Sequence, residues 1–448
     1  MLPEDAQERL IKLGADRLAE ELIKLAFRVA EVYETVERLI SSPEENRDRF
    51  LKRLGKLRRG RKFYDWRTAP ELAGELEGML EDLRAACPEP KQGLELLAKF
   101  YACDGRTLER CDDSDGWVGS VFSEAATDLF TEYAKRCQDK AWVADLVFRL
   151  YLEDDYGVRH GLLTRIADYL PEEEARRLAA RLLDWAEENP KQAFHCRIGV
   201  ETIAQKLKDP RLFERAALLG GEAPTPGVLL QIAEVYLEAD EPEEALEWLE
   251  RVPPPDRSYF QDQHDHLRYE IYTRLGRKEE AAEVAWNIFR RHRSKGTLEL
   301  LLRAIGEERR EEVVAQEVAG ILERQRFSYE DASFLVELGR LAEAEQYLLR
   351  HRDKLDGNLY STLLPWARAL EGDYPLGATV VYRALLESIL ERAITKYYHH
   401  GVRYLRKLES LAPRIEDWQG ITPHREYFSE LREAHKRKRS FWAKYQGQ

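Results

Sequence analysis

One short pattern recurs along the second half of this 448-residue chain. An aromatic or aliphatic residue is followed one helical turn later by a turn residue, and a small residue stands five positions beyond the turn. The copies are Tyr236, Asp240 and Ala245; Tyr272, Gly276 and Ala281; Leu335, Gly339 and Ala344; and Gly372 with Gly377, where Arg368 replaces the apolar residue. The small residues are 36, 63 and 33 positions apart, a drifting spacing that is typical of stacked helical hairpins. The pattern therefore predicts an array of helix pairs that presents surface for binding.

The composition agrees with a helical chain. Hydrophobic residues make up 44% and charged residues 34%, and Ala, Leu, Glu and Arg dominate, which favours helix over strand. No alternating run rich in Val and Ile is long enough to predict a sheet. We therefore expect an all-α protein.

The sequence also predicts where such a chain resides. Its first sixteen residues are acidic and amphipathic, unlike a secretory signal, and no apolar stretch reaches the roughly 18 residues that span a bilayer. The cysteines are odd in number and lack C-x-x-C pairing; they are Cys87, Cys103, Cys111, Cys137 and Cys196. We expect free, mostly buried thiols in a reducing cytoplasm, and no contact with a membrane.

Charge is distributed unevenly along the chain. The net charge of -13 argues against broad binding of nucleic acid. Residues 51–64 nevertheless contain seven basic side chains and no acid, and residues 391–448 contain 13 basic against 7 acidic residues. These two patches predict binding of an acidic partner or a phosphate, although solvated helix ends would have the same composition. The candidate binding residues are Arg58, Arg59, Arg61, Lys62 and Trp66 in the first patch, and Arg437, Arg439 and Trp442 in the second.

The aromatic residues of the second patch have an alternative role. Phe441 and Trp442 could stack on bases or dock on a partner, but a terminal helical hairpin also leaves apolar surface that must be covered. We favour the sealing role.

Breaks in the helical pattern predict three regions. Residues 1–140 form a helical N-terminal region, and residues 141–221 form regular helical hairpins. The Gly- and Pro-rich segment around Glu222 then begins the repeat region, residues 222–448, which ends in the basic C-terminal cap.

Motifs for common chemistry are missing. The chain contains no P-loop, dinucleotide-binding, nucleophile-elbow or zinc-protease motif. The acidic loop from Cys111 to Gly116 fails the calcium-loop pattern, because Cys111 occupies the first ligand position. We expect its Asp and Ser residues to cap a helix or form turns. The sequence thus predicts no metal site and no cofactor.

One pair of residues offers an enzymatic alternative. Arg392 and His399 have the Arg-x6-His form of the helical-bundle ribonucleases called HEPN, which the pair resembles. In that family a cationic Arg stabilises the developing phosphorane charge and a His moves the 2′-OH proton. Arg392 could equally end a helix while His399 caps the next one or packs on tyrosines. We expect no catalytic activity, and the nuclease remains the alternative.

The repeat units resemble degenerate tetratricopeptide repeats. They span 227–254, 265–292, 328–352 and 358–385. In the first unit, the residues at the consensus positions are Leu229, Ile232, Ala233, Tyr236, Ala245 and Leu249. Tryptophan is absent from the consensus fourth position, which Asp265 occupies in the second unit. This resemblance implies a right-handed superhelix, an α-solenoid.

The chain as a whole is similar to an uncharacterised bacterial family that occurs alone or joined to SWIM-type zinc fingers. The similar stretches are residues 60–67, 109–114, 382–386, 400–405 and 434–442. The resemblance implies no established activity, and the zinc-finger cysteines and histidine themselves are missing from this sequence. It does imply a SWIM-type zinc finger protein as a partner.

The sequence therefore predicts an all-α, right-handed superhelix of tetratricopeptide-like hairpins that acts as a cytoplasmic, non-catalytic scaffold for protein partners in a bacterial multi-protein system. The alternatives are a HEPN-like nuclease and a nucleic-acid-binding adaptor. Any binding of nucleic acid is expected to be weak.

Overall fold

The computed structural model describes residues 5–86, 88–221, 223–253 and 260–447. Within these residues the chain forms helices and no strand, and one isolated bridge joins Tyr64 to Cys111. The chain packs as two compact units, an N-terminal unit of Met1–Pro254 and a C-terminal unit of Pro255–Gln448. The all-α prediction is confirmed. The predicted divisions after residues 140 and 221 stay predictions, and Glu222 lies outside the described residues.

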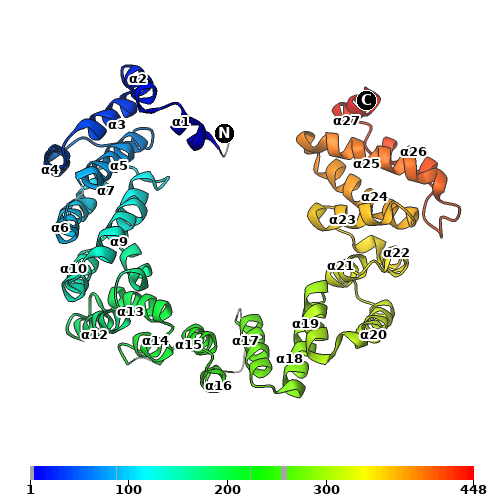
Figure 1. Cartoon of the computed structure of the whole chain (residues 1–448). Coiled ribbons are helices and arrows are strands. Elements are labelled where there is room, and N and C mark those ends of the chain that lie inside the picture. The colour runs from blue at the N-terminus through cyan, green and yellow to red at the C-terminus, as the bar shows by residue number, and fades with distance from the viewer. Residues whose placement is uncertain (1–4, 87, 222, 254–259, 448) are drawn as a thin grey trace. The chain divides into compact units, whose positions relative to one another are not determined.

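The N-terminal unit is built from helices that pack on their neighbours in the chain (Figure 1). Its helices are α1 (Ala6–Lys12), α2 (Ala15–Ala26), α3 (Ala30–Ile40), α4 (Pro43–Arg59), α5 (Ala69–Ala86), α6 (Pro90–Tyr101), α7 (Asp104–Leu108), α8 (Trp117–Ser120), η1 (Val121–Ala125), α9 (Ala126–Arg136), α10 (Lys140–Leu152), α11 (Gly161–Thr164), η2 (Ile166–Asp168), α12 (Glu172–Glu188), α13 (Ala193–Leu207), α14 (Pro210–Ala217), α15 (Pro226–Glu238) and α16 (Pro242–Glu250). The most extensive pairings in this unit are α12 with α13, α15 with α16, and α4 with α5.

The C-terminal unit follows the same plan, with a large apolar core that runs from Tyr269 to Phe441 and a small separate cluster of Leu376, Val380, Ile415 and Ile421. Its helices are α17 (Gln261–Arg274), α18 (Lys278–Arg291), α19 (Lys295–Ile305), η3 (Glu307–Arg309), α20 (Arg310–Glu323), α21 (Tyr329–Glu337), α22 (Leu341–Arg350), η4 (Arg352–Lys354), α23 (Tyr360–Leu370), α24 (Pro375–Arg392), η5 (Thr395–Tyr397), α25 (Tyr398–Leu411), η6 (Ala412–Arg414), α26 (His424–Ala434) and α27 (Arg439–Gln446). The longest of these, α24, packs against both α23 and α25.

Three of the recurrent sequence patterns form one and the same turn between paired helices. Asp240, Gly276 and Gly339 have φ angles of 63°, 70° and 70°, in the left-handed region. In each turn the next residue donates its backbone N–H to the carbonyl five positions before it, at 3.0, 2.9 and 2.9 Å; the acceptors are Tyr236, Tyr272 and Leu335. This is the bond that closes a Schellman motif, so the pattern marks real helix ends.

The small residues of the pattern lie where helices meet. Ala245, Ala281 and Ala344 are 0%, 4% and 0% exposed, which confirms that the pattern places them in the core. The fourth copy is different, because Gly372 is not left-handed, yet Gly377 is buried and its N–H donates to Glu345 of α22 at 2.7 Å.

A further turn of this kind escaped the sequence pattern. Lys208 has a φ of 51°, and the N–H of Asp209 donates to the carbonyl of Ala204 at 2.9 Å, between α13 and α14. Lysine has no preference for the left-handed conformation, so a lysine at this position does not indicate a turn in the sequence.

The last helix closes the core of the C-terminal unit. Phe441 of α27 is fully buried and packs edge-on against Tyr398 at 5.5 Å. The Trp442 indole N–H donates to the carbonyl of His435 at 2.9 Å. The sealing role predicted for these two aromatic residues agrees with this packing.

The described cysteines are free thiols. Cys103, Cys137 and Cys196 are buried and Cys111 is partly buried, while Cys87 lies outside the described residues. Among the helices that the structure describes, none is both long and apolar enough to cross a bilayer.

Candidate functional site

The first basic segment forms one wall of a cleft in the N-terminal unit. The cleft has a volume of about 650 Å³ and lies among α3, α4, α5, the segment after α4, and Arg110. Seven cationic side chains line it, namely Arg49, Lys52, Arg53, Lys56, Arg61, Lys62 and Arg110. Four acids line it as well, namely Glu34, Glu37, Glu75 and Asp82. The cleft thus has an excess of three positive charges on a chain whose net charge is -13.

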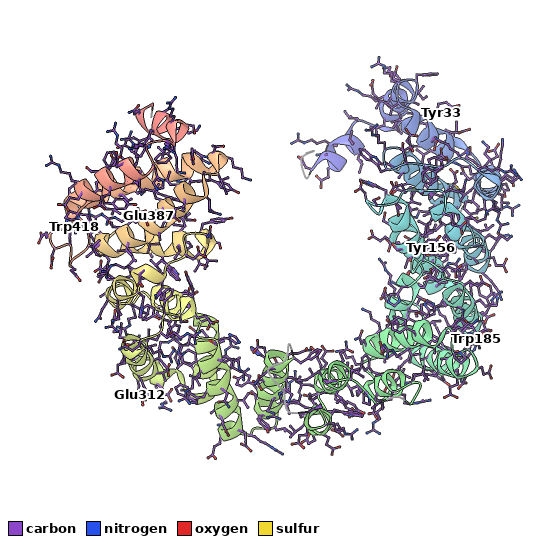
Figure 2. All side chains as sticks on the ribbon, turned by 180° about the vertical axis from the view of Figure 1, so that it is seen from behind. Tyr33, Tyr156, Trp185, Glu312, Glu387 and Trp418 are labelled. Atoms are coloured by element: carbon purple, nitrogen blue, oxygen red, sulfur yellow. The ribbon has the colours of Figure 1, made fainter. Side chains whose placement is uncertain are left out.

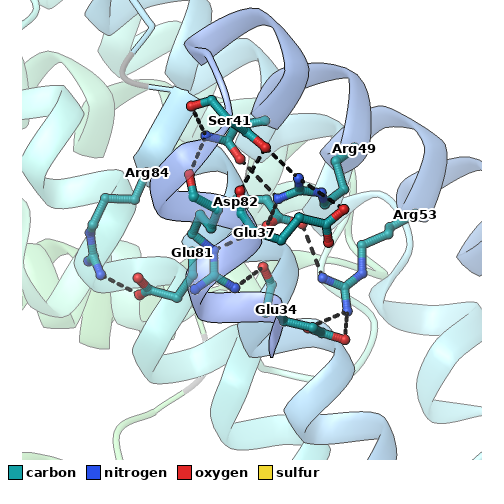
Figure 3. Close-up of polar contacts among 11 residues, drawn as sticks. Glu34, Glu37, Ser41, Arg49, Arg53, Glu81, Asp82 and Arg84 are labelled. Atoms are coloured by element: carbon teal, nitrogen blue, oxygen red, sulfur yellow. Dashed lines mark hydrogen bonds and ion pairs between the residues drawn. The ribbon is translucent and has the colours of Figure 1, made fainter. Parts of the chain in front are cut away.

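The back of the cleft is an ion-pair network around a buried acid (Figure 3). Asp82 of α5 is 1% exposed, and its carboxylate accepts from Nε of Arg38 at 3.2 Å and from Nη1 of Arg53 at 3.1 Å. Nη1 of Arg49 lies 3.5 Å from the same carboxylate. A buried carboxylate needs such partners to remain charged, so Asp82 fixes three guanidinium groups in place.

Two outer acids complete the network. Glu34 lies 3.2 Å from Nη2 of Arg53, and Glu37 lies 3.7 Å from Nη2 of Arg49. Burial alone would lower the pKa of Arg53, but the hydrogen bond to Asp82 and the charge of Glu34 outweigh it, and the pKa is raised. Arg38, Arg49 and Arg53 are therefore balanced by Asp82, Glu34 and Glu37.

The front of the cleft carries cations that have no acidic partner. Lys52, Lys56, Arg61 and Lys62 are exposed, and no carboxylate in the described part of the chain lies within 4.0 Å of their charged atoms. Lys62 instead places its ammonium 4.3 Å from the centre of the Tyr64 ring. These four side chains supply the positive charge that a ligand would meet.

The segment after α4 is held against a distant part of the same unit. The N–H of Tyr64 donates to the carbonyl of Arg110 at 2.8 Å, and the N–H of Asp112 donates to the carbonyl of Tyr64 at 2.8 Å. Arg110 also donates to the carbonyl of Leu57 at 3.2 Å, where α4 ends. A β-carbon at Gly60 would come within 2.5 Å of this guanidinium, which would then have to shift. Hydrogen bonds to a distant segment thus hold the rim of the cleft.

Not every predicted residue of the first patch lines the cleft. Arg61 and Lys62 do, whereas Arg58 faces the thiol of Cys103 and Arg59 folds back toward Gly55. Trp66 is 54% exposed beside the cleft segment, with the Arg67 guanidinium 4.9 Å from its ring centre.

The second basic patch belongs to the C-terminal unit. Arg437 and Arg439 are exposed near the start of α27, and Trp442 packs against Phe428 with ring centres 6.0 Å apart. Because Trp442 is partly buried in this way, its ring contributes to the fold as well as to the surface.

The structure places Arg392 and His399 on different helices. Arg392 is the last residue of α24, where its Nε donates to the carbonyl of Ser388 at 3.2 Å. Ala393 then turns the chain with a φ of 54°, and His399 lies exposed in the first turn of α25 with its ring beside that of His400. The two residues therefore do not share an uninterrupted helix.

The acidic loop between α7 and α8 has the capping role expected of it. The Asp113 carboxylate accepts from the backbone N–H groups of Val118 and Gly119, each at 2.8 Å. No group of three His, Cys, Asp or Glu side chains in the described ranges is arranged to hold a metal ion.

Sequence reasoning missed part of the cleft. Arg49 continues the spacing of Lys52, Arg53 and Lys56 along one face of α4, and this helical spacing is a signal that could have been used. The role of Arg110, from a distant segment, had no such signal.

The fold and the cleft define an all-helical protein with a cationic cleft in its N-terminal unit. The chain belongs to DUF6880, a family of unknown function whose model matches residues 6–219 and 221–444. No curated protein matches it. The expected membership in an uncharacterised family is therefore confirmed.

Proposed function

We propose that this chain is a non-catalytic scaffold whose cationic cleft binds an acidic segment of a protein partner. The observation that carries the proposal is the set of Lys52, Lys56, Arg61 and Lys62, which are exposed at the cleft without acidic partners among the described residues. Each exposed ion pair contributes about 0.2–1 kcal/mol, so four of them together contribute about 1–4 kcal/mol, which supports a weak affinity.

The cleft favours a protein segment over nucleic acid. Beneath the cations the partly exposed Leu57 also lines it, which suits an aliphatic side chain of a peptide. The acidic body of the chain opposes an extended phosphate backbone that continues past the cleft, because like charges repel. The partner proposed from the family resemblance is a SWIM-type zinc finger protein.

We propose further that the helix pairs form a right-handed, tetratricopeptide-like superhelix. Three turns with a left-handed residue at the same position and with the same closing hydrogen bond support this, as do the buried small residues that follow each turn. The cytoplasm is the proposed location, supported by the free thiols of the described cysteines.

A competition experiment tests the choice of ligand. A fluorescent peptide of alternating Glu and Leu is bound to the protein and then displaced by unlabelled peptide or by a short single-stranded RNA, at low and at physiological salt. The proposal predicts that peptide displaces the probe at lower concentration than RNA in both buffers. Displacement by RNA that persists at physiological salt would favour the nucleic-acid adaptor, and failure of the peptide to bind would refute the proposal.

A further inference from the structure

A second polar cleft lies in the C-terminal unit. It has a volume of about 580 Å³ and lies between α24, the segment after η4, and the segment that leads into α26. One face of α24 supplies Val380, Arg383, Ala384, Glu387, Ser388, Glu391 and Arg392 to it. Figure 2 labels Glu387 and Trp418 on this part of the unit. The volume is that of a small-molecule site.

Arg383 is a buried cation whose charge is not balanced. It is 8% exposed, and its Nη2 donates to the carbonyl of Thr422 at 2.8 Å. The guanidinium lies 3.9 Å from the centre of the Tyr427 ring. Its buried Nε has no hydrogen-bond partner, and no carboxylate among the described residues lies within 4.0 Å of it. Buried charges in proteins are normally paired, so this donor is suited to an anionic group from outside the chain.

Glu387 lies one helical turn further along α24 and faces the same cleft. Burial raises the pKa of its carboxyl, and the Tyr427 hydroxyl and Arg383 offset only part of that effect. In the described part of the chain Glu387 makes no ion pair within 4.0 Å. The rise of 1.5 Å per residue separates Glu387 from Arg383 by about 6 Å along the helix axis. The inner part of the cleft therefore presents one cation and one carboxyl group, neither of which has an ion-pair partner within 4.0 Å among the described residues, while the exposed Arg352, Glu391 and Arg392 line its outer part.

The wall opposite α24 is held by packing and hydrogen bonds, and its one exposed cation, Arg352, donates to the carbonyl of Leu349 at 3.0 Å. Gly357 lies directly on α24, since a side chain there would come within 2.0 Å of the carbonyl of Ala384. The Ser388 hydroxyl donates to the Asn358 side chain at 3.1 Å, and Asp356 accepts from Nδ2 of Asn358 at 2.7 Å. Asp353 pairs with Lys354 at 3.0 Å. The unpaired charges deep in the cleft are thus those of Arg383 and Glu387.

We propose that this cleft binds a free α-amino acid, whose carboxylate accepts from Arg383 and whose ammonium donates to Glu387. A simple anion would meet the Glu387 carboxylate, and a simple cation would meet the Arg383 guanidinium, so a zwitterion suits the pair better than either. The rest of the volume receives the amino-acid side chain. The site is separate from the cationic cleft and does not depend on the proposed function.

Thermal shift and calorimetric titration of the full chain with the twenty free amino acids test this proposal. For any amino acid that binds, the matching deaminated acid and decarboxylated amine are titrated under the same conditions. The proposal predicts that at least one amino acid binds and that each analogue binds at least tenfold more weakly. Failure of all twenty to bind would overturn it, and so would equal binding of the acid, which would indicate a simple anion site.

Variants locate the binding. Glu387→Gln and Arg383→Gln are each expected to weaken binding at least tenfold, whereas Glu323→Gln, an exposed residue at the end of α20, leaves it unchanged. Arg383 also anchors the segment at Thr422, so Arg383→Gln could disturb the fold. Its affinity is compared with that of the wild type only if the variant shows a cooperative unfolding transition. If Arg383→Gln does not fold, Glu387→Gln alone tests the proposal. Unchanged affinity for the amino acid in Glu387→Gln would refute the proposal.

Discussion

The buried carboxylate of Asp82 lies 3.1 Å from Nη1 of Arg53, and Lys56, three residues further along α4, has no acidic partner in the described part of the chain. One face of α4 thus contains both kinds of cation, those that hold the fold together and those that remain free. This separation explains how an acidic chain keeps a local excess of positive charge, since the acids of the network neutralise only the inner guanidinium groups.

The inner network predicts a large loss of stability when its acid is removed. Asp82→Asn leaves Arg38, Arg49 and Arg53 without their buried counter-charge, and we expect the free energy of unfolding to fall by about 3 kcal/mol. Glu37→Gln, at the exposed edge of the same network, should cost less than about 1 kcal/mol. Urea unfolding of the two variants measures the difference, and equal losses would show that Asp82 does not organise the network.

The hairpin turns predict opposite effects of one substitution at two glycines. Gly276→Ala forces a β-carbon into the left-handed region and should destabilise the protein by about 1 kcal/mol, although nothing lies near the new atom. Gly320→Ala, inside α20 and equally uncrowded, should stabilise it by about 0.5–1 kcal/mol. Thermal unfolding gives both values, and the same sign at both positions would contradict the assignment of the turn.

Glu387 predicts a dependence of stability on pH. Because burial raises its pKa, the folded state holds the proton more tightly than the unfolded state, so the charged carboxyl destabilises the fold at neutral pH. Glu387→Gln without ligand should therefore be more stable than the wild type at pH 7. This gain should shrink as the pH falls through the raised pKa toward the ordinary Glu value of about 4.3. Denaturant unfolding at several pH values tests this, and a gain that does not change with pH would refute it.

Arg392 and His399 lie on two different helices, and we therefore predict that the protein does not cleave RNA. The change of chain direction at Ala393 removes the shared helical face on which the two side chains would meet at one phosphate. Wild type and His399→Ala are incubated with a mixed RNA substrate, and neither should cut it. Cleavage by the wild type that is lost in the variant would establish the nuclease alternative.

The sequence predicted those parts of the fold where a residue type has a strong local preference. Gly276 and Gly339 marked helix ends because glycine adopts the left-handed conformation without strain. The turn at Lys208 has the same geometry, but there the surrounding packing imposes a conformation that lysine does not favour.

The two clefts depend on contacts between segments that are distant in the sequence, and the sequence pattern indicated these contacts only in part. The run of basic residues before Tyr64 predicted a cationic surface, but Asp82 could not be told apart from the many exposed acids on helices. Arg383 and Glu387, four residues apart, have the spacing of an ordinary surface ion pair. Only the packing of Thr422 and Tyr427 over α24 shows that Arg383 is buried.

The central claim is that the free cations of the first cleft bind an acidic segment, and calorimetric titration with the Glu and Leu peptide tests it most directly. Lys52→Glu with Lys56→Glu reverses two of these charges. The control, Lys191→Glu with Lys206→Glu, makes the same change at exposed positions of the same unit outside the cleft. We predict that the cleft variant binds at least about tenfold more weakly than wild type and that the control stays within about twofold. Equal weakening in both variants, or full affinity in the cleft variant, would contradict the claim.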